Sequence, residues 1–242
     1  MIFKTIENIT EKDIDDLYDG TVQGIIVNNA TPEDVKTFGE LEEQDLYLKK
    51  EVPIGTDDET EDHVWQEVDM MWHSDRAYLD DVHPFCGLYC HSADEGSSPT
   101  YFTDNFTAWN MLSEDLKTKI KALDEVEFTV RRYLEKEKYP HTFRSPVWER
   151  AFYMHARAKH KLYRNDEFGE YLFYSEAYAI IDEQLKNEIE RTIYVPENIY
   201  AHQWKPNQLV VWNNFTLTHR RDHTPKHINR RLLRYAFHRN ET

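Results

Sequence analysis

Residues 208–238 read QLVVWNNFTLTHRRDHTPKHINRRLLRYAFH, and this stretch indicates the fold more clearly than any other part of the chain. QLVVWNN (208–214) and RRLLRYAFH (230–238) combine aromatic and branched aliphatic residues in runs of strand length. Similar runs lie upstream, between segments with helical patterns. We therefore predict a mainly β protein with peripheral helices, in a β-sandwich or jelly-roll arrangement.

The last of these runs has two different faces. Side chains alternate along a strand, so Arg230 and Arg234 share one face with Leu232, and the other face is apolar. The apolar face is expected if a helix covers the sheet from outside. Two inward arginines would be costly unless they meet anions, and a guanidinium suits a dicarboxylate. The alternative is that both arginines are solvated on an edge strand.

The remaining elements follow from periodicity and capping signals. Further strands are predicted at 24–29, 68–75, 84–93, 100–104, 126–134 and 170–175. Helices are predicted at 9–19, 31–41, 105–123 and 177–194, with Thr10 and Thr31 as N-caps of the first two. Residues 44–62 are acidic and indicate a surface loop, and residues 140–165 indicate irregular structure.

Composition bounds the class of protein. The chain has 242 residues without repeats or Gly/Ser-rich linkers, so we expect a single domain over 1–242. Its formal net charge of −16 disfavours binding to nucleic acid. The alternative is that the acidic residues only keep the protein soluble. No apolar stretch is long enough to span a membrane, and the N-terminus does not resemble a signal peptide. A cytoplasmic protein with a small-molecule substrate is expected, and its oligomeric state is not predicted.

The two cysteines are expected to be structural. Cys86 and Cys90 lie four residues apart on one face of a predicted strand, which places both thiols in the core. Two cysteines are too few for a disulfide framework.

A short motif, WHSD (72–75), carries metal-binding chemistry. Strand alternation would project His73 and Asp75 to the same side, and an imidazole beside a carboxylate supplies two of the three ligands of a 2-His-1-carboxylate iron site. The pair alone is a weak signal. His219, at the end of QLVVWNNFTLTH, is the candidate third ligand, because a sandwich can bring such distant strands face to face.

Other histidines are weaker candidates. His219, His223 and His227 recur every four residues, as in a helical zinc site, but Pro225 would break that helix. Of the others only His238, on the inward face with Arg234, is expected to line a cavity.

The chain resembles the TauD/TfdA (taurine dioxygenase-like) family of Fe(II)/2-oxoglutarate oxygenases. The segment from WHSD to Thr100 resembles that family's HxD motif and the Gly-rich turn that ends in threonine. Residues 212–238 resemble its second signature, in which arginines follow the distal histidine by 11 and 15 residues. The similarity extends over roughly residues 20–238.

The resemblance implies a double-stranded β-helix (jelly roll) and a set of roles. His73, Asp75 and His219 match the iron ligands, Thr100 and Arg230 match the residues that hold the distal carboxylate of 2-oxoglutarate, and Arg234 matches an arginine near the proximal carboxylate and the primary substrate. The implied cofactors are Fe(II), 2-oxoglutarate and O₂. The implied reaction hydroxylates an unactivated C–H bond and yields succinate and CO₂.

Two departures from the family pattern stand out. The family's Trp-Asp-Asn is Trp212-Asn213-Asn214 here, and its Gly-rich turn is Gly96-Ser97-Ser98-Pro99-Thr100. The first replaces a carboxylate that would lie behind the metal ligands, and this bears on how the distal strand is tethered.

The substrate is expected to be a small polar metabolite, such as a free amino acid or an amine-containing acid. Arg234 would meet its acidic group, and Asp69, four residues before His73, would meet its ammonium group. The alternative for Asp69 is a solvent-facing or hydrogen-bonded carboxylate.

Two other functions stay open at this point: a different metal-dependent enzyme on the same fold, which would not need Thr100 or Arg230, and a non-catalytic binding domain.

Overall fold

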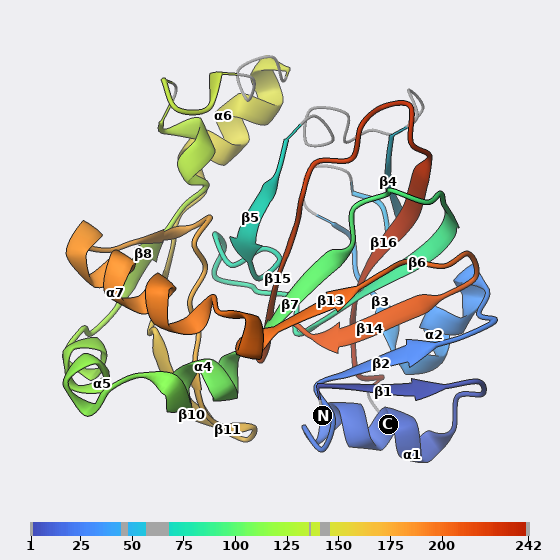
Figure 1. The fold of residues 1–242 in the computed structure, drawn as a ribbon, viewed down its shortest axis with the longest axis horizontal. Helices are drawn as coiled ribbons and strands as arrows, with labels where there is room; N and C mark the ends of the chain where they lie inside the picture. Colours follow the sequence, from blue (N-terminus) through green and yellow to red (C-terminus); the bar gives the residue numbers. More distant parts are fainter. Residues whose placement is uncertain (1, 45–47, 57–67, 136, 141–145, 241–242) are drawn as a thin grey trace.

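The computed structural model describes residues 2–44, 48–56, 68–135, 137–140 and 146–240. Two β-sheets lie at its centre and helices lie at its edges (Figure 1). The predicted mainly β architecture with peripheral helices is therefore confirmed.

The larger sheet has the strand order β1-β2-β14-β6-β16-β3, with β4 also paired to β16. All its pairs are antiparallel except β1 with β2. Its strands are β1 (Phe3–Ile6), β2 (Gly24–Val27), β3 (Glu40–Leu41), β4 (Val52–Gly55), β6 (Phe85–Ala93), β14 (Leu209–Asn213) and β16 (Arg230–His238).

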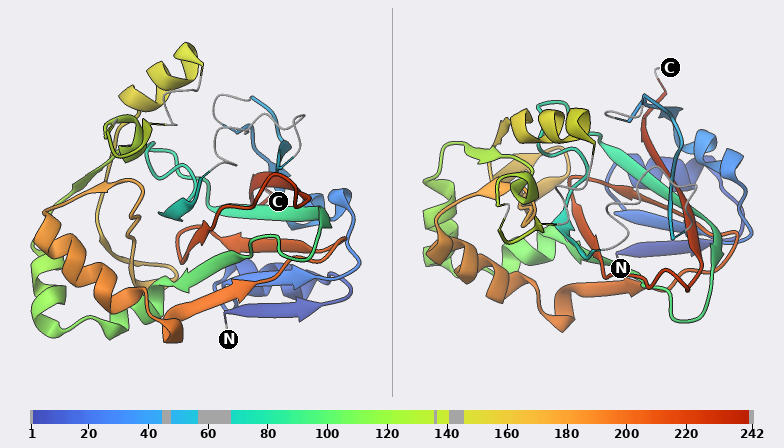
Figure 2. Two further views of the ribbon diagram at one scale, coloured as in Figure 1. Left: turned by 45° about the horizontal axis from the view of Figure 1, so that its top comes forward. Right: turned by 90° about the horizontal axis from the view of Figure 1, so that it is seen from above.

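The second sheet faces the first and has the order β13-β7-β15-β5. All its pairs are antiparallel. Its strands are β5 (Met70–His73), β7 (Thr100–Asp104), β13 (Ile199–His202) and β15 (Leu217–Arg221). Figure 2 shows the two sheets from two further directions.

Strand alternation gives the larger sheet two apolar faces. One face packs on the second sheet, where Leu88, Trp212 and Leu232 meet Phe102. The other face, with Tyr235 and Phe237, is covered by α1 (Glu11–Tyr18) and by the turn formed by η1 (Pro32–Asp34) and α2 (Val35–Phe38). The predicted division of the two faces of β16 is confirmed.

The cysteines follow the same alternation. Cys86 and Cys90 are buried and unbridged, and both lie in the cluster between the two sheets. The structural role expected for them agrees with this position.

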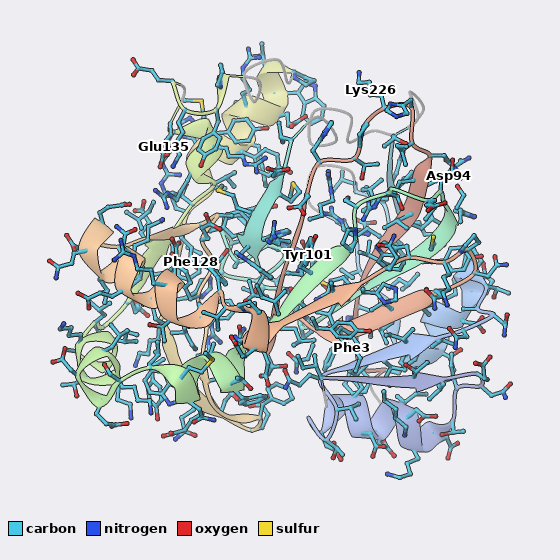
Figure 3. All side chains as sticks on the ribbon, viewed as in Figure 1. Phe3, Asp94, Tyr101, Phe128, Glu135 and Lys226 are labelled. Carbon is cyan, nitrogen blue, oxygen red and sulfur yellow. The ribbon has the colours of Figure 1, made fainter. Side chains whose placement is uncertain are left out.

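A third part of the molecule has its own apolar cluster around Phe128. In Figure 3 this side chain lies well away from Phe3, which belongs to the cluster between the sheets. Its helices are α4 (Asn105–Met111), α5 (Glu114–Lys121), η3 (Arg131–Tyr133), α6 (Val147–His155) and α7 (Glu183–Ile193). The short η5 (Pro196–Asn198) follows α7 and precedes β13. Its strands are β8 (Val126–Phe128), β9 (Ala158–His160), β10 (Tyr163–Asp166), β11 (Gly169–Leu172) and β12 (Ala179–Ile180).

Both predicted N-terminal caps are present. Thr10 and Asp13 form a capping box at α1, and Thr31 and Asp34 form another at η1. The second segment begins as a 3₁₀ turn rather than as the expected α-helix.

Several predicted boundaries were wrong. The helix expected over 105–123 is two helices, because Ser113 caps a new start at Glu114 and its Oγ accepts a hydrogen bond from the backbone N–H of Leu116. The strand expected over 126–134 ends at Phe128, and the helix expected over 177–194 begins only at Glu183.

Two segments expected to be irregular contain regular structure. β4 lies inside the acidic stretch 44–62, where it pairs with β16, and residues 45–47 and 57–67 lie outside the described residues. The stretch 140–165 contains α6, β9 and part of β10. Within the described ranges, no helix combines the length and the apolar composition needed to cross a bilayer.

Candidate active site

The pairing of β5 with β15 brings two distant histidines together. His73 and His219 are direct partners in this ladder, and their ring centroids lie 4.2 Å apart. The Asp75 Oδ1 atom lies 3.4 Å from His73 Nε2 and 3.8 Å from His219 Nε2. All three side chains are buried. The sequence separation of more than 140 residues is therefore closed by strand pairing in the second sheet.

Asp75 reaches this position by a turn and not by strand alternation, which corrects the expected reason for its placement. β5 ends at His73, and Asp75 lies in the turn that follows. The Asn214 side chain holds this turn: its Oδ1 accepts the Asp75 N–H at 2.8 Å, and its Nδ2 donates to the carbonyls of Asp75 and His83. The loop after β14 thereby positions the carboxylate.

Burial and mutual proximity shift the protonation of these groups. Burial alone would raise the pKa of Asp75, but the hydrogen bond from His73 and the nearby His219 and Arg234 outweigh it and hold this pKa well below its usual range. Burial, together with His73 and Arg234, lowers the pKa of His219 to about 3. At neutral pH the site therefore offers a carboxylate and a neutral imidazole at His219, the forms that bind metal.

The donor set fits a divalent iron ion. One ligand atom from each of His73, Asp75 and His219 lies within 4.8 Å of the others. His73 Nδ1 lies 2.7 Å from the Met71 carbonyl. When Nδ1 of the neutral ring donates to this oxygen, the Nε2 lone pair is left to bind a metal ion in place of the hydrogen bond to Asp75. Two imidazoles and one carboxylate are the ligands of a facial triad, which leaves coordination positions open.

A smaller cavity beside these three residues is lined by arginines. Thr100 and Arg230 line it together with His73, Asp75 and His219, and it also contacts Arg220, Arg221 and Arg234. Its empty volume is about 480 Å³, including the part open to solvent, which is in the range of small-molecule sites.

Arg230 is a buried cation at the wall of this cavity. It is 3% exposed, and its Nε has no hydrogen-bond partner among the described residues. Burial, with the nearby Arg221, lowers its pKa to about 9. Thr100 Oγ1 accepts from Trp204 Nε1 at 3.0 Å and from Arg230 Nη2 at 3.5 Å, so its own O–H is available to donate. This pair fits a carboxylate.

A larger cavity of about 780 Å³ shares Met70, His73, Asp75 and Arg234 with the smaller one. Arg234 therefore lies where the two cavities meet. Gln44 holds it, because Gln44 Oε1 accepts from Arg234 Nε at 2.6 Å and Gln44 Nε2 donates to the Arg234 carbonyl at 2.8 Å.

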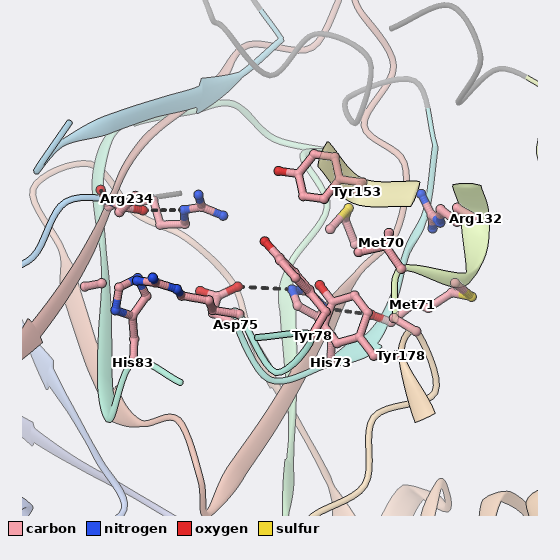
Figure 4. Close-up of a pocket in the computed structure, with 15 residues that line it drawn as sticks. Met70, Met71, His73, Asp75, Tyr78, His83, Arg132, Tyr153, Tyr178 and Arg234 are labelled. Carbon is pink, nitrogen blue, oxygen red and sulfur yellow. Dashed lines mark hydrogen bonds and ion pairs between the residues drawn. The ribbon is translucent and has the colours of Figure 1, made fainter. Parts of the chain in front are cut away.

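The larger cavity contains residues that the sequence did not point to. Figure 4 shows Arg234 and His83 on one side of Asp75, and Tyr178, Met71 and Arg132 on the other. Further lining residues are Arg76, Tyr78 and Tyr153. They come from separate segments of the chain, so no local motif could have grouped them.

Two predicted residues are not brought to the site. Asp69 lies before the first residue of β5, so strand alternation does not apply to it; it is exposed, and its Oδ1 accepts the His223 N–H at 2.7 Å. His238 contacts Glu42 and Glu40. Neither residue is among the described residues that line the two cavities, so the structure does not place Asp69 or His238 where they were expected.

The two departures from the family pattern have local roles. Asn213 Oδ1 accepts the backbone N–H groups of Phe215 and Thr216, so the amide folds the loop between β14 and β15 without a carboxylate. In the turn before Thr100, Gly96 has a φ of +87°. The N–H and the hydroxyl of Ser98 both form hydrogen bonds with the Thr224 hydroxyl.

Solved structures share this fold at low sequence identity. The AAD-2 protein in complex with Mn(II) and N-oxalylglycine is 16% identical with a TM-score of 0.77, and the match covers 99% of this chain and 94% of that one. A taurine dioxygenase from Burkholderia xenovorans is 14% identical with a TM-score of 0.70, covering 98% and 87%. The PvcB protein from Pseudomonas aeruginosa is 20% identical with a TM-score of 0.64, covering 90% and 76%.

The family itself is shown by sequence. The model of the taurine catabolism dioxygenase TauD, TfdA family matches residues 5–236, nearly the whole chain. The chain therefore belongs to the taurine catabolism dioxygenase TauD, TfdA family and is a 2-oxoglutarate-dependent dioxygenase that uses Fe(II) and O₂.

Proposed function

We propose that His73, Asp75 and His219 hold the Fe(II) of this dioxygenase. The support is the convergence of their ligand atoms, their burial, and a carboxylate that stays ionised beside a neutral imidazole. When bound, the ion activates O₂ and couples the oxidative decarboxylation of 2-oxoglutarate, to succinate and CO₂, with oxidation of the substrate.

The smaller cavity is the 2-oxoglutarate site in this proposal. The observation that carries it is the buried guanidinium of Arg230, whose Nε has no partner among the described residues. Arg230 and the Thr100 hydroxyl bind the distal carboxylate, and Arg234 lies toward the metal-proximal end. A desolvated contact between a cation and a carboxylate is strong because the alternative is a buried charge without a counter-ion.

The larger cavity holds the primary substrate, which is hydroxylated at an unactivated C–H bond. Arg76, Arg132 and Arg234 line it, whereas Asp75 is the single acidic side chain among its described lining residues. This favours a small polar metabolite with an acidic group. An amine-containing acid has its acidic half matched here, but Asp69 does not supply the counter-ion for the ammonium half.

The experiment is succinate formation from 2-oxoglutarate with Fe(II) and O₂, over a panel of amino acids, sulfonates and phenoxyacetates. We expect the acids without an ammonium group to stimulate succinate formation more than amino acids do. Asp69→Asn is the matched variant and should leave the preference unchanged, since an Asn side-chain oxygen can still accept the His223 N–H. An absence of 2-oxoglutarate-dependent succinate would reject the site assignment, and a preference for amino acids that Asp69→Asn removes would reject the substrate proposal.

We also propose that the two sheets close as a double-stranded β-helix and that residues 1–242 form one domain. Strands from both ends of the chain lie in one sheet, with β1 and β2 paired through β14 to β6 and β16. Such interleaving favours a single cooperative unfolding transition, and two separated transitions in calorimetry would contradict it.

A further inference from the structure

His83 is a buried histidine on the wall of the larger cavity, and no role in the reaction proposed above uses it. It is 4% exposed. Its two ring nitrogens have different partners: Nδ1 makes a short contact with Glu42 Oε2, and Nε2 lies 3.2 Å from Arg76 Nη1.

The chemistry of these partners fixes the proton on the ring. A guanidinium has donors only, so Nε2 must accept the Arg76 N–H. Nδ1 then carries an N–H and donates it to Glu42. Glu42 is held in turn, because its N–H donates to the Ala236 carbonyl at 2.8 Å and its Oε1 lies 3.1 Å from His238 Nδ1.

Arg76, at the other end of this chain of contacts, has an unusual backbone. Its φ is +62°, a conformation that costs energy for a residue with a Cβ, and it directly follows Asp75. The strain places a guanidinium in the cavity next to the proposed metal ligands. Arg76 also lies 3.5 Å from Asp81, whose side chain is 82% exposed, and so exposed an ion pair contributes little.

We propose that Arg76 binds the acidic group of the substrate and that His83 and Glu42 position its guanidinium for this contact. The inference rests on the proposed function, in which the larger cavity holds the primary substrate. Segment 40–44 then supports both cationic groups on this side of Asp75: Glu42 holds Arg76 through His83, and Gln44 holds Arg234 directly. His83 is a positioning residue and acts through Arg76.

The test measures binding of two matched probes, phenoxyacetate and 2-phenoxyethanol, to protein loaded with Mn(II) and N-oxalylglycine. Loading occupies the metal and 2-oxoglutarate positions and is checked first by thermal stabilisation, so a failure of the proposed function appears at that step. Calorimetric titration should then show the acid binding at least about tenfold more tightly than the alcohol, as a charge-assisted contact predicts.

The variants separate positioning from general structure. Arg76→Gln should weaken the acid by roughly tenfold or more and leave the alcohol within about twofold. His83→Leu should do the same to a smaller extent, His83→Gln should recover part of the loss because its amide oxygen can accept from Arg76, and the double variant should be no worse than Arg76→Gln. Arg231→Gln removes a positive charge from the exposed surface of β16 and should leave the affinity for both probes unchanged.

Three results would overturn the proposal. The first is wild-type binding of the acid no tighter than the alcohol, including no binding of either. The second is an acid preference that survives Arg76→Gln. The third is a His83→Leu variant that weakens both probes equally, since that is the effect of a merely structural residue.

Discussion

Among single residues, the buried Arg230 is the one that we propose for binding the distal carboxylate of the cosubstrate. Its guanidinium is 3% exposed beside Thr100, whereas its neighbour Arg231 is exposed on the other face of β16. Truncating a desolvated charged contact costs roughly 2–5 kcal/mol, so Arg230→Ala should raise the 2-oxoglutarate requirement by about 30-fold or more. Arg231→Ala is the control and should leave it unchanged. The measurement is a steady-state titration with 2-oxoglutarate. The reverse result would mean that Arg231, and not Arg230, faces the cavity.

Asn214 is the residue behind Asp75 with the clearest predicted effect on metal binding. Its side chain makes three hydrogen bonds, two of them to the Asp75 backbone. Loss of a partner that orients a metal ligand typically costs 10–100-fold in affinity, so Asn214→Ala should weaken Mn(II) binding by about that factor. Circular dichroism should show a retained fold. Unchanged Mn(II) affinity would show that the turn at Asp75 holds without Asn214.

Some site residues could be predicted from the sequence and others could not. Arg230 could be predicted because strand alternation holds along β16. His219 could be predicted because the spacing of the family signature relates it to Arg230 and Arg234. The reason given for Asp75 failed, since β5 ends at His73 and a side chain 139 residues away sets the turn. Asp69 lies before β5 begins, so strand alternation did not place its side chain either. His83 depends on Glu42, 41 residues distant, which no local pattern reveals.

At the scale of elements, the pairing of β13 with β7 creates a pH-dependent contribution to stability. His202, opposite Thr100 in this ladder, is 4% exposed, and burial with the nearby Lys205 lowers its pKa to about 4. In the unfolded chain this histidine binds a proton near pH 6.5. The contribution of His202 to the free energy of unfolding is therefore complete above pH 6.5 and is lost as the pH falls toward 4. The loss is on the order of 3 kcal/mol.

Urea unfolding of wild type and His202→Gln between pH 7 and pH 4 measures this contribution. The free energy of unfolding should fall less steeply for the variant. His219 titrates in the same direction in both proteins, so their difference isolates His202. Parallel curves would show that His202 makes no such contribution.

The boundaries of helices, and two short elements, were the hardest features to predict from the sequence. The periodicity of 105–123 is continuous, yet Ser113 starts a second helix, because a capping hydroxyl competes with continuation of the first. α6 was missed in the stretch 140–165, where Trp148 is exposed and the buried face shows Glu149 and Tyr153 rather than an apolar stripe. β4 was missed because its partner β16 supplies its stability.

At the scale of the whole molecule, the proposed ligands and the proposed 2-oxoglutarate residues come from both sheets. His73 and His219 lie in the second sheet and Arg230 in the larger one. Joint binding of Mn(II) and N-oxalylglycine should therefore stabilise the whole fold, by about 2.7 kcal/mol at a ligand concentration 100 times its dissociation constant. In differential scanning calorimetry, adding both ligands should raise the Tm of the wild type and leave the Tm of Asp75→Ala unchanged. An equal rise in that variant would place the metal elsewhere.

In the proposed arrangement, one buried site holds the metal and the dicarboxylate together. The most direct measurement is a crystal structure of the protein with Mn(II) and N-oxalylglycine, with the metal located by its anomalous scattering. We expect one manganese ion bound by His73, Asp75 and His219, and a distal carboxylate in contact with Arg230 and Thr100. A metal bound elsewhere, or a carboxylate that leaves Arg230 without a partner, would contradict it.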